Sequence, residues 1–311
     1  MKKLYASAAL LLAAIIWGFA FVAQTVGMDH VGPFTFQSSR YLLGALTLVP
    51  VILVSDSRKK KAGTYREMTQ AEKKTLLKGG LACGVVMTFA ASFQQVGLAY
   101  TTVGKSGFIT SMYIILVPVF GLFLHKRVPA KIWGCVVVAA VGFYFLSING
   151  PLELSRGDTL TVLCSLCFCF HILCVDHFVS LTDAIKLSFL QLLTTGVISG
   201  IIMFLFEQPT WNAIQSALPA ILYAGILSCG VAYTLQVVGQ QYAAPTVATL
   251  LMSLESVFSV LGGILLLSHA AFDIAFYLFM IVEVERLGRQ RGRHNSLSFP
   301  FSRRRSASPA A

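Results

Sequence analysis

The feature that most constrains this chain is a series of apolar runs that are each long enough to cross a lipid bilayer. A hydrocarbon core about 30 Å thick requires about 20 mostly apolar residues per helix. Nine runs meet this requirement: 4–27, 33–54, 79–100, 102–124, 130–148, 159–177, 184–206, 215–237 and 243–268. A tenth, 270–284, is shorter and carries Asp273 and Glu283. Only 12% of the residues are charged, against about 25% in a soluble domain. The sequence therefore predicts an all-α polytopic membrane protein with about ten transmembrane helices.

The net charge of +11 is explained by membrane topology. Lys and Arg gather at the N-terminus, in 58–78, in 126–131 and in the C-terminal tail. All of these segments fall on one side if the N-terminus is cytoplasmic and the chain crosses ten times, as the positive-inside rule requires. The basic residues therefore predict a cytoplasmic N-terminus and give no support to a nucleic-acid partner.

The stretch AYTTVGKSG, 99–107, suggests two enzymatic interpretations, and neither is favoured. It lacks the first glycine of a phosphate-binding loop, because Ala99 stands there, and no strand precedes it. It also contains the G-x-S-G pattern of rhomboid-type intramembrane serine proteases, with Ser106 as nucleophile, but the small-residue pattern expected after a partner such as His171 is missing. We expect Lys105 to extend to the outer interface; alternatively, it lines an outer vestibule and attracts anions.

The chain contains an internal repeat. VGLAY at 96–100 recurs as VGQQY at 238–242, a shift of 142 residues that also aligns Ser111 with Ser253. A shift of 151 aligns Trp17 with Phe168 and Arg40 with Gln191. Spans one to five are therefore predicted to be repeated as spans six to ten. Because each repeat has an odd number of crossings, the second must be inverted relative to the first.

These features resemble the drug/metabolite transporter (DMT) superfamily, and more narrowly its EamA-type transporters. The resemblance rests on the inverted blocks, on WGFAF at 17–21, on Arg40 seven residues after Pro33, and on PVFGLFL at 118–124. It implies a secondary transporter of the cytoplasmic (inner) cell membrane, often an exporter of amino acids, metabolites or toxic compounds.

The resemblance divides the chain into a first EamA-like repeat at 4–148, a second at 159–284 and a basic tail at 285–311. The Gly-Glu pair usual at the ends of the fourth and ninth helices is replaced by His125-Lys126-Arg127 and by Ser268-His269. The tail is rich in Arg and Ser, a composition typical of disorder. One hypothesis is that the last helix is truncated or altered; the alternative is a short tilted helix followed by a basic cytoplasmic tail.

No cofactor or metal is predicted. Cys164, Cys167, His171 and Cys174 share one face of a helix, which superficially resembles a metal site. A straight helix can offer two of these groups to one ion but cannot arrange four of them as a tetrahedron. We therefore expect the thiols to pack as small polarizable groups.

Glu255 is the strongest candidate for a functional residue. It lies near the middle of span nine, where an ionisable group is costly and needs a reason. The repeat places Tyr113 at the equivalent depth of span four, and inverted-repeat transporters bind their substrates at this depth. Glu255 either binds a cationic group or takes up and releases a coupling proton. The alternative is a permanently protonated side chain bonded to Ser253 or Ser256.

Several other polar residues are candidates for the same cavity. Trp17, Gln94, Gln95 and Gln236 could line it, or each could be a satisfied helix contact. His171 could relay protons to Glu255 or simply pack against another helix. Arg40 either extends outward to the interface or binds an anionic group of the substrate.

The sequence thus predicts a secondary transporter, an exporter of small metabolites, amino acids or drugs that works by alternating access in contact with membrane lipid. The alternatives are a non-transporting membrane scaffold or remnant and an intramembrane serine protease. Gly196-x-x-x-Gly200 and Gly262-Gly263 allow close helix contacts. We expect these contacts within the bundle, although they also permit a homodimer.

Overall fold

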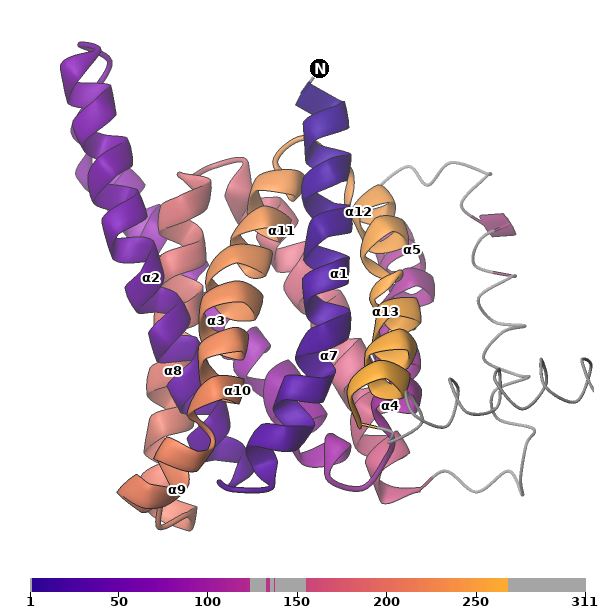
Figure 1. Ribbon diagram of the computed structural model, residues 1–311. Coiled ribbons are helices and arrows are strands. Elements are labelled where there is room, and N and C mark those ends of the chain that lie inside the picture. Colours follow the sequence, from indigo (N-terminus) through magenta and orange to yellow (C-terminus); the bar gives the residue numbers. More distant parts are fainter. Residues whose placement is uncertain (1, 124–132, 135–136, 138–154, 268–311) are drawn as a thin grey trace, which may run out of the picture. The chain divides into compact units, whose positions relative to one another are not determined.

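The computed structural model describes residues 2–123, 133–134, 137 and 155–267 (Figure 1). Its elements are α1 (Lys2–Met28), α2 (Pro33–Lys61), α3 (Gln70–Leu98), α4 (Val103–Thr110), α5 (Tyr113–Phe123), α7 (Arg156–Val179), α8 (Ala184–Phe206), α9 (Trp211–Ser216), α10 (Leu218–Leu222), the π-helix η1 (Tyr223–Ala232), α11 (Tyr233–Gln240), α12 (Pro245–Met252), α13 (Glu255–Gly262) and the π-helix η2 (Gly263–Leu267). These described ranges are helical apart from turns and contain no strand, which confirms the predicted fold class.

Eight helical spans are long and apolar enough to cross a membrane within the described ranges. They correspond to eight of the nine long spans predicted from the sequence. The predicted span 130–148, the shorter span 270–284 and the tail 285–311 lie outside or almost entirely outside the described residues. Two boundaries were wrong: α2 continues to Lys61, and α3 already begins at Gln70. The start of α3 is fixed by a capping box, in which the side chains of Thr69 and Glu72 accept each other's backbone N–H.

The helices α2 and α8 lie antiparallel and are joined by ion pairs at the face where α1 begins, which we call the N-terminal face. Lys59 Nζ lies 3.1 Å from Asp183 Oδ2, and Lys186 Nζ lies 2.9 Å from Asp56 Oδ2. Asp183 also caps α8 by accepting the amides of Ile185 and Lys186. Partial burial raises the pKa of the Asp183 carboxyl, but the bonds to Lys59 and to the two amides lower it further, so that the net pKa lies below its usual value.

The opposite ends of α2 and α8 are joined at the other face, which we call the distal face. Glu207, the residue after α8, accepts the backbone amides of Phe34 and Thr35 in the first turn of α2, at 2.8 Å each. A carboxylate at a helix N-terminus satisfies free N–H groups and interacts favourably with the helix dipole. A side chain of one helix therefore completes the hydrogen bonding of the other.

The spans alternate in direction, and the second set is inverted relative to the first (Figure 1). From the N-terminal face to the distal face run α1, α3, α8 and the pair α12–α13, while α2, the pair α4–α5, α7 and the segment α10 to α11 run the other way. The first set begins with α1, which runs toward the distal face. The second set begins with α7, which runs away from the distal face. This is the inverted arrangement that the sequence repeat predicts.

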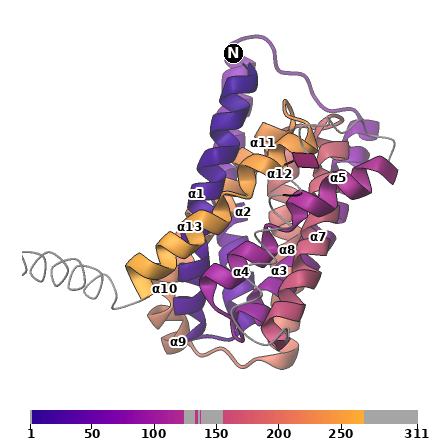
Figure 2. The same cartoon turned by 90° about the vertical axis from the view of Figure 1, so that its right-hand side faces the viewer.

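Two spans are interrupted at equivalent positions, which the sequence analysis did not predict. The break between α4 and α5 lies at Ser111–Met112, and the break between α12 and α13 lies at Ser253–Leu254, 142 residues later (Figure 2). Near both breaks backbone N–H groups bond three residues back, as in Ile114 to Ser111 and Ser256 to Ser253. The two serine hydroxyls donate to carbonyls of the preceding turn, a competition with the backbone that bends helices. Pro118 lies beyond the first break and has no proline counterpart in the second, so it does not explain the paired breaks.

Small residues allow close helix contacts, as the sequence analysis expected. Gly196 and Gly200 of α8 lie against Leu42 and Ser38 of α2. At the distal face, Gly157 of α7 lies against the end of α3, where a Cβ atom would stand 2.7 Å from the carbonyl oxygen of Gly97. The neighbour at this contact is backbone, which cannot move aside as a flexible side chain would.

We predict that Gly157→Ala lowers the free energy of unfolding by about 1–3 kcal/mol, because the added methyl group must displace the backbone of α3. Gly263→Ala is the matched control, since a Cβ atom there meets only Val103, at 3.8 Å. The measurement is the thermal unfolding midpoint of the detergent-solubilised protein. Equal midpoints for the two variants would contradict the close contact between α7 and α3.

Candidate functional site

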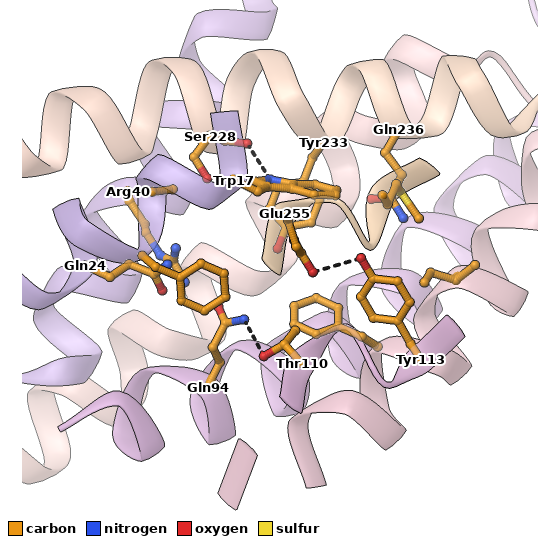
Figure 3. A pocket seen from close by; sticks show the side chains of 15 residues that line it. Trp17, Gln24, Arg40, Gln94, Thr110, Tyr113, Ser228, Tyr233, Gln236 and Glu255 are labelled. Atoms are coloured by element: carbon orange, nitrogen blue, oxygen red, sulfur yellow. Dashed lines mark hydrogen bonds between the residues drawn. The ribbon is translucent and has the colours of Figure 1, made fainter. Parts of the chain in front are cut away.

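A buried pocket lies where the two inverted sets of helices meet (Figure 3). It is lined by Trp17, Ala20, Phe21, Gln24, Arg40, Gln94, Thr110, Tyr113, Phe168, Ile172, Ser228, Tyr233, Gln236, Met252 and Glu255. The lining combines aromatic surface with amide, hydroxyl, guanidinium and carboxyl groups. Such a mixture suits an amphipathic solute and is unusual inside a membrane bundle that only needs to pack.

Ten of the fifteen lining residues form pairs that the repeat makes equivalent. The shift of 151 pairs Trp17 with Phe168 and Phe21 with Ile172, and the shift of 142 pairs Gln94 with Gln236, Thr110 with Met252 and Tyr113 with Glu255. Both members of each of these five pairs line the pocket. The pocket therefore lies on the axis that relates the two repeats, next to both helix breaks.

Glu255 is the first residue of α13, directly after the second break, and it is only 4% exposed. Its Oε1 accepts a hydrogen bond of 2.8 Å from the hydroxyl of Tyr113, the first residue after the other break. Ser111 Oγ lies 3.5 Å from the same oxygen. The alternative partners expected from the sequence were wrong, because the hydroxyls of Ser253 and Ser256 donate to backbone carbonyls. The contact of Glu255 instead joins the two repeats.

Trp17 and Tyr233 form one aromatic wall of the pocket, with ring centroids 4.9 Å apart. The indole Nε1 of Trp17 donates to the carbonyl of Ser228, at 3.3 Å, inside the π-helix η1. The hydroxyl of Tyr233 lies 3.1 Å from that of Tyr41 in α2. A π-helical segment shifts the backbone register, and such segments are frequent at functional sites.

The equivalent glutamines Gln94 and Gln236 both line the pocket but differ in their contacts. Gln94 Nε2 donates to Thr110 Oγ1 at 3.4 Å. Gln236 Oε1 is buried and has no hydrogen-bond partner among the described residues. The side-chain carbonyl of Gln236 can therefore accept a hydrogen bond from a solute.

Arg40 is 2% exposed, so the expectation that it extends outward to the interface was wrong. Its guanidinium lies 4.8 Å from the ring centroid of Tyr41 and 5.9 Å from that of Phe36. No carboxylate in the described part of the chain pairs with Arg40, and its Nε and Nη2 atoms have no acceptor there. A buried cation without a counter-ion thus lines the pocket.

Three candidates from the sequence do not line the pocket. His171 is buried and its Nε2 lies 3.1 Å from Gln191 Oε1. Gln95 is buried elsewhere, with both amide atoms unbonded among the described residues. Lys105 pairs its ammonium at 2.5 Å with Asp158, whose side chain is 0% exposed, while the side chain of Lys105 is 38% exposed. The sequence analysis did not single out Asp158, because an acidic residue at the start of a span does not lie at the membrane centre, where a charge is costly and needs a reason.

The contacts of Ser106 and His171 do not form a protease pair. The hydroxyl of Ser106 is buried without a hydrogen-bond partner in the described ranges, and His171 bonds Gln191. The described residues also include no group of three His, Cys, Asp or Glu side chains that could hold a metal ion. Cys174, one of the four residues that superficially resemble a metal site, instead places its thiol 3.4 Å from that of Cys83 in α3.

The sequence analysis missed several lining residues that its own patterns could have found. Gln24 lies seven residues, two helical turns, after Trp17 and therefore on the same face of α1. Tyr233 lies three residues before Gln236. Ser228 could not be predicted from the sequence. It contributes its backbone carbonyl, which accepts from Trp17, and the π-helical register that presents this carbonyl is not visible in the sequence.

The fold and the pocket define a multi-pass helical membrane protein whose inverted repeats enclose a polar site. Residues 4–148 and 155–282 match the model of the EamA-like transporter family. The chain belongs to this family.

Related proteins agree with this membership. An uncharacterized transporter of Archaeoglobus fulgidus is 29% identical over 279 residues, which cover 89% of this chain and 83% of that protein. The uncharacterized transporter YoaV of Bacillus subtilis is 24% identical over 222 residues, 70% of this chain and 73% of YoaV. One protein of known crystal structure superposes with a TM-score of 0.64 at 18% identity, covering 84% of this chain and 89% of that one. This last similarity concerns the fold alone.

We predict that Lys105→Met lowers the free energy of unfolding by about 1–3 kcal/mol, because it leaves the buried carboxylate of Asp158 without its cation. Thr101 and the backbone of Ser155 still donate to Asp158, which limits the loss. The double variant Lys105→Met/Asp158→Asn should lose less than the sum of the two single variants. Thermal unfolding midpoints in detergent provide the measurement, with the exposed Lys73→Met as control. Strict additivity would show that the pair is not coupled.

Proposed function

We propose that this protein is a secondary transporter that exports a small amphipathic solute by alternating access. The observation that carries this proposal is the position of the pocket on the axis of the inverted repeats, beside two symmetric helix breaks. Inverted-repeat transporters bind substrates in this place, and rocking of one repeat against the other exposes the site to each side in turn. Family membership and the uncharacterized transporters among its relatives support a transport function.

The distribution of charge supports an orientation with the N-terminal face in the cytoplasm of the inner membrane. Among the described loops and helix ends, the N-terminal face carries Arg58, Lys59, Lys60, Lys61, Arg66, Lys73, Lys74 and Lys186, whereas the distal face carries Lys105 and Arg156. Lys105 is neutralised by Asp158. This asymmetry is what the positive-inside rule expects of cytoplasmic loops.

Glu255 is the residue we propose for coupling transport to a proton. Desolvation favours the neutral form of a carboxyl group, and access of water favours the charged form. In the structure Glu255 is buried and held by Tyr113 of the other repeat. Movement of the two repeats changes this environment, so that Glu255 would take up a proton when the pocket opens to one side and release it on the other.

The lining supports a solute with both apolar and polar parts. Trp17, Phe21, Phe168 and Tyr233 supply aromatic surface, while Gln24 and Gln236 present amide groups. Small metabolites, amino acids included, and drugs of similar size share this chemistry. The driving force would come from an ion or solute gradient, with no bound cofactor.

We predict that Glu255→Gln reduces proton-driven flux by about tenfold or more, because glutamine cannot exchange a proton. The purified protein is reconstituted into proteoliposomes, and a panel of amino acids, nucleosides and cationic drugs is screened with and without a pH gradient. Glu67→Gln, at an exposed position before α3, is the matched control and should transport like the unaltered protein.

The outcomes separate coupling from transport itself. Loss of gradient-driven flux with retained solute exchange in Glu255→Gln supports proton coupling at this residue. An unchanged response to the pH gradient would disprove that role. Absence of flux for every solute, with the protein folded and inserted, would count against the transporter proposal.

A further inference from the structure

Arg40 and its equivalent in the second repeat have different surroundings. The shift of 151 places Gln191 where the first repeat has Arg40, and His171 where it has Ala20. In the second repeat the two polar side chains bond each other, since His171 Nε2 lies 3.1 Å from Gln191 Oε1, although His171 Nδ1 and Gln191 Nε2 have no partner among the described residues. In the first repeat, Ala20 stands where the second repeat has His171, and its methyl group cannot bond the side chain of Arg40. Ala20 and Arg40 both line the pocket.

This difference leaves a buried positive charge in the pocket lining with no carboxylate partner among the described residues. Arginine keeps its proton under all physiological conditions. Burying a charge without a partner is expensive, and removing one member of a buried pair costs several kcal/mol for the same reason. The rings of Tyr41 and Phe36 stabilise a cation in part, but aromatic faces do not accept the in-plane N–H groups of a guanidinium.

We propose, building on the transport function above, that Arg40 is the anion-binding group of the pocket and that the transported solute carries a carboxylate. A guanidinium presents parallel N–H donors that match the two oxygens of a carboxylate. Its Nε and Nη2 atoms, which have no acceptor in the described part of the protein, form such a pair of donors. The solute supplies the carboxylate partner that Arg40 does not find among the described residues.

The neighbouring groups fit this assignment. Gln24 lies beside Arg40 at one end of the view in Figure 3, and its Oε1, which has no donor among the described residues, can accept a hydrogen bond from a donor group of the solute other than its carboxylate. Tyr113 and Glu255 lie farther along the pocket and are bonded to each other. The anion site is therefore separate from the carboxyl group proposed for proton coupling, and the aromatic lining between the two contacts the body of the solute.

The test compares acids with their uncharged amides on the purified full-length protein. The probes are 3-phenylpropanoate against 3-phenylpropanamide, and phenylalanine against phenylalaninamide. Binding is measured as the ligand-dependent rise of the thermal unfolding midpoint. We expect each acid to bind about tenfold more tightly than its amide, and we expect this preference to be lost in Arg40→Gln and partly kept in Arg40→Lys. Arg156→Gln, an exposed arginine at the distal face that lies over the ring of Tyr100, is the matched control and should keep the preference.

The stability of the unliganded variants distinguishes a binding role from a structural one. Because the charge of Arg40 has no carboxylate partner among the described residues, unliganded Arg40→Gln should unfold at the same temperature as the unaltered protein or higher. A lower midpoint for unliganded Arg40→Gln, or equal binding of acids and amides by the unaltered protein, would overturn the proposal. A preference that needs the ammonium group of phenylalanine as well as its carboxylate still supports Arg40 as the anion site and shows that the solute is a zwitterion.

Failure of this inference differs from failure of the transport proposal. If solutes are transported but Arg40→Gln transports carboxylates as before, the anion site is wrong and the transporter remains. If carboxylates bind through Arg40 but nothing is transported, the site stands and the transport function is wrong.

Discussion

Lipid offers no hydrogen-bond partner to the backbone, and this constraint governs the whole structure. Helices satisfy it within themselves, so the described chain crosses as helices throughout. Where a helix departs from regular bonding, the departure must be buried in protein. Both breaks, at Ser111 and at Ser253, lie inside the bundle against each other, with Ser111 Oγ at 3.3 Å from the Ser253 carbonyl oxygen. The polar pocket lies beside them because the interior of the bundle is where irregular backbone and polar side chains can be accommodated.

The inverted repeat places this irregular region on a symmetry axis, and sequence divergence between the repeats gives it chemistry. Tyr113 and Glu255 are equivalent by position and complementary as donor and acceptor. Arg40 and Gln191 are equivalent too, but only Gln191 keeps a partner. Symmetry explains how two similar halves can exchange conformations, while the differences explain how the pocket distinguishes one solute from another. At the distal face, Lys105 and Asp158 add a contact whose equivalents, Val247 and Ser7, do not carry charge.

The sequence predicted the spans because hydropathy over 20 residues reports directly on the bilayer, and it predicted the inversion because the repeat has an odd number of crossings. It also named six pocket residues, Trp17, Arg40, Gln94, Tyr113, Gln236 and Glu255. It failed where the outcome depends on rotation about the helix axis: His171 and Gln95 are as polar as Gln94 but do not line the pocket. It did not predict that Lys105 pairs with Asp158, because an ion pair depends on a neighbour that is distant in the sequence. The breaks were missed because serine is common in membrane helices and bends them only in some contexts.

The most direct test of alternating access is the accessibility of the pocket from each side of the membrane. The seven native cysteines are replaced and a single cysteine is introduced as Thr110→Cys, which lines the pocket beside the first break. A membrane-impermeant maleimide is then applied from either face of oriented vesicles, with the pH gradient in one direction and then reversed. The account predicts labelling from both faces, with the two rates changing in opposite directions when the gradient is reversed. Labelling from one face only under every condition, or parallel changes of both rates, would contradict it.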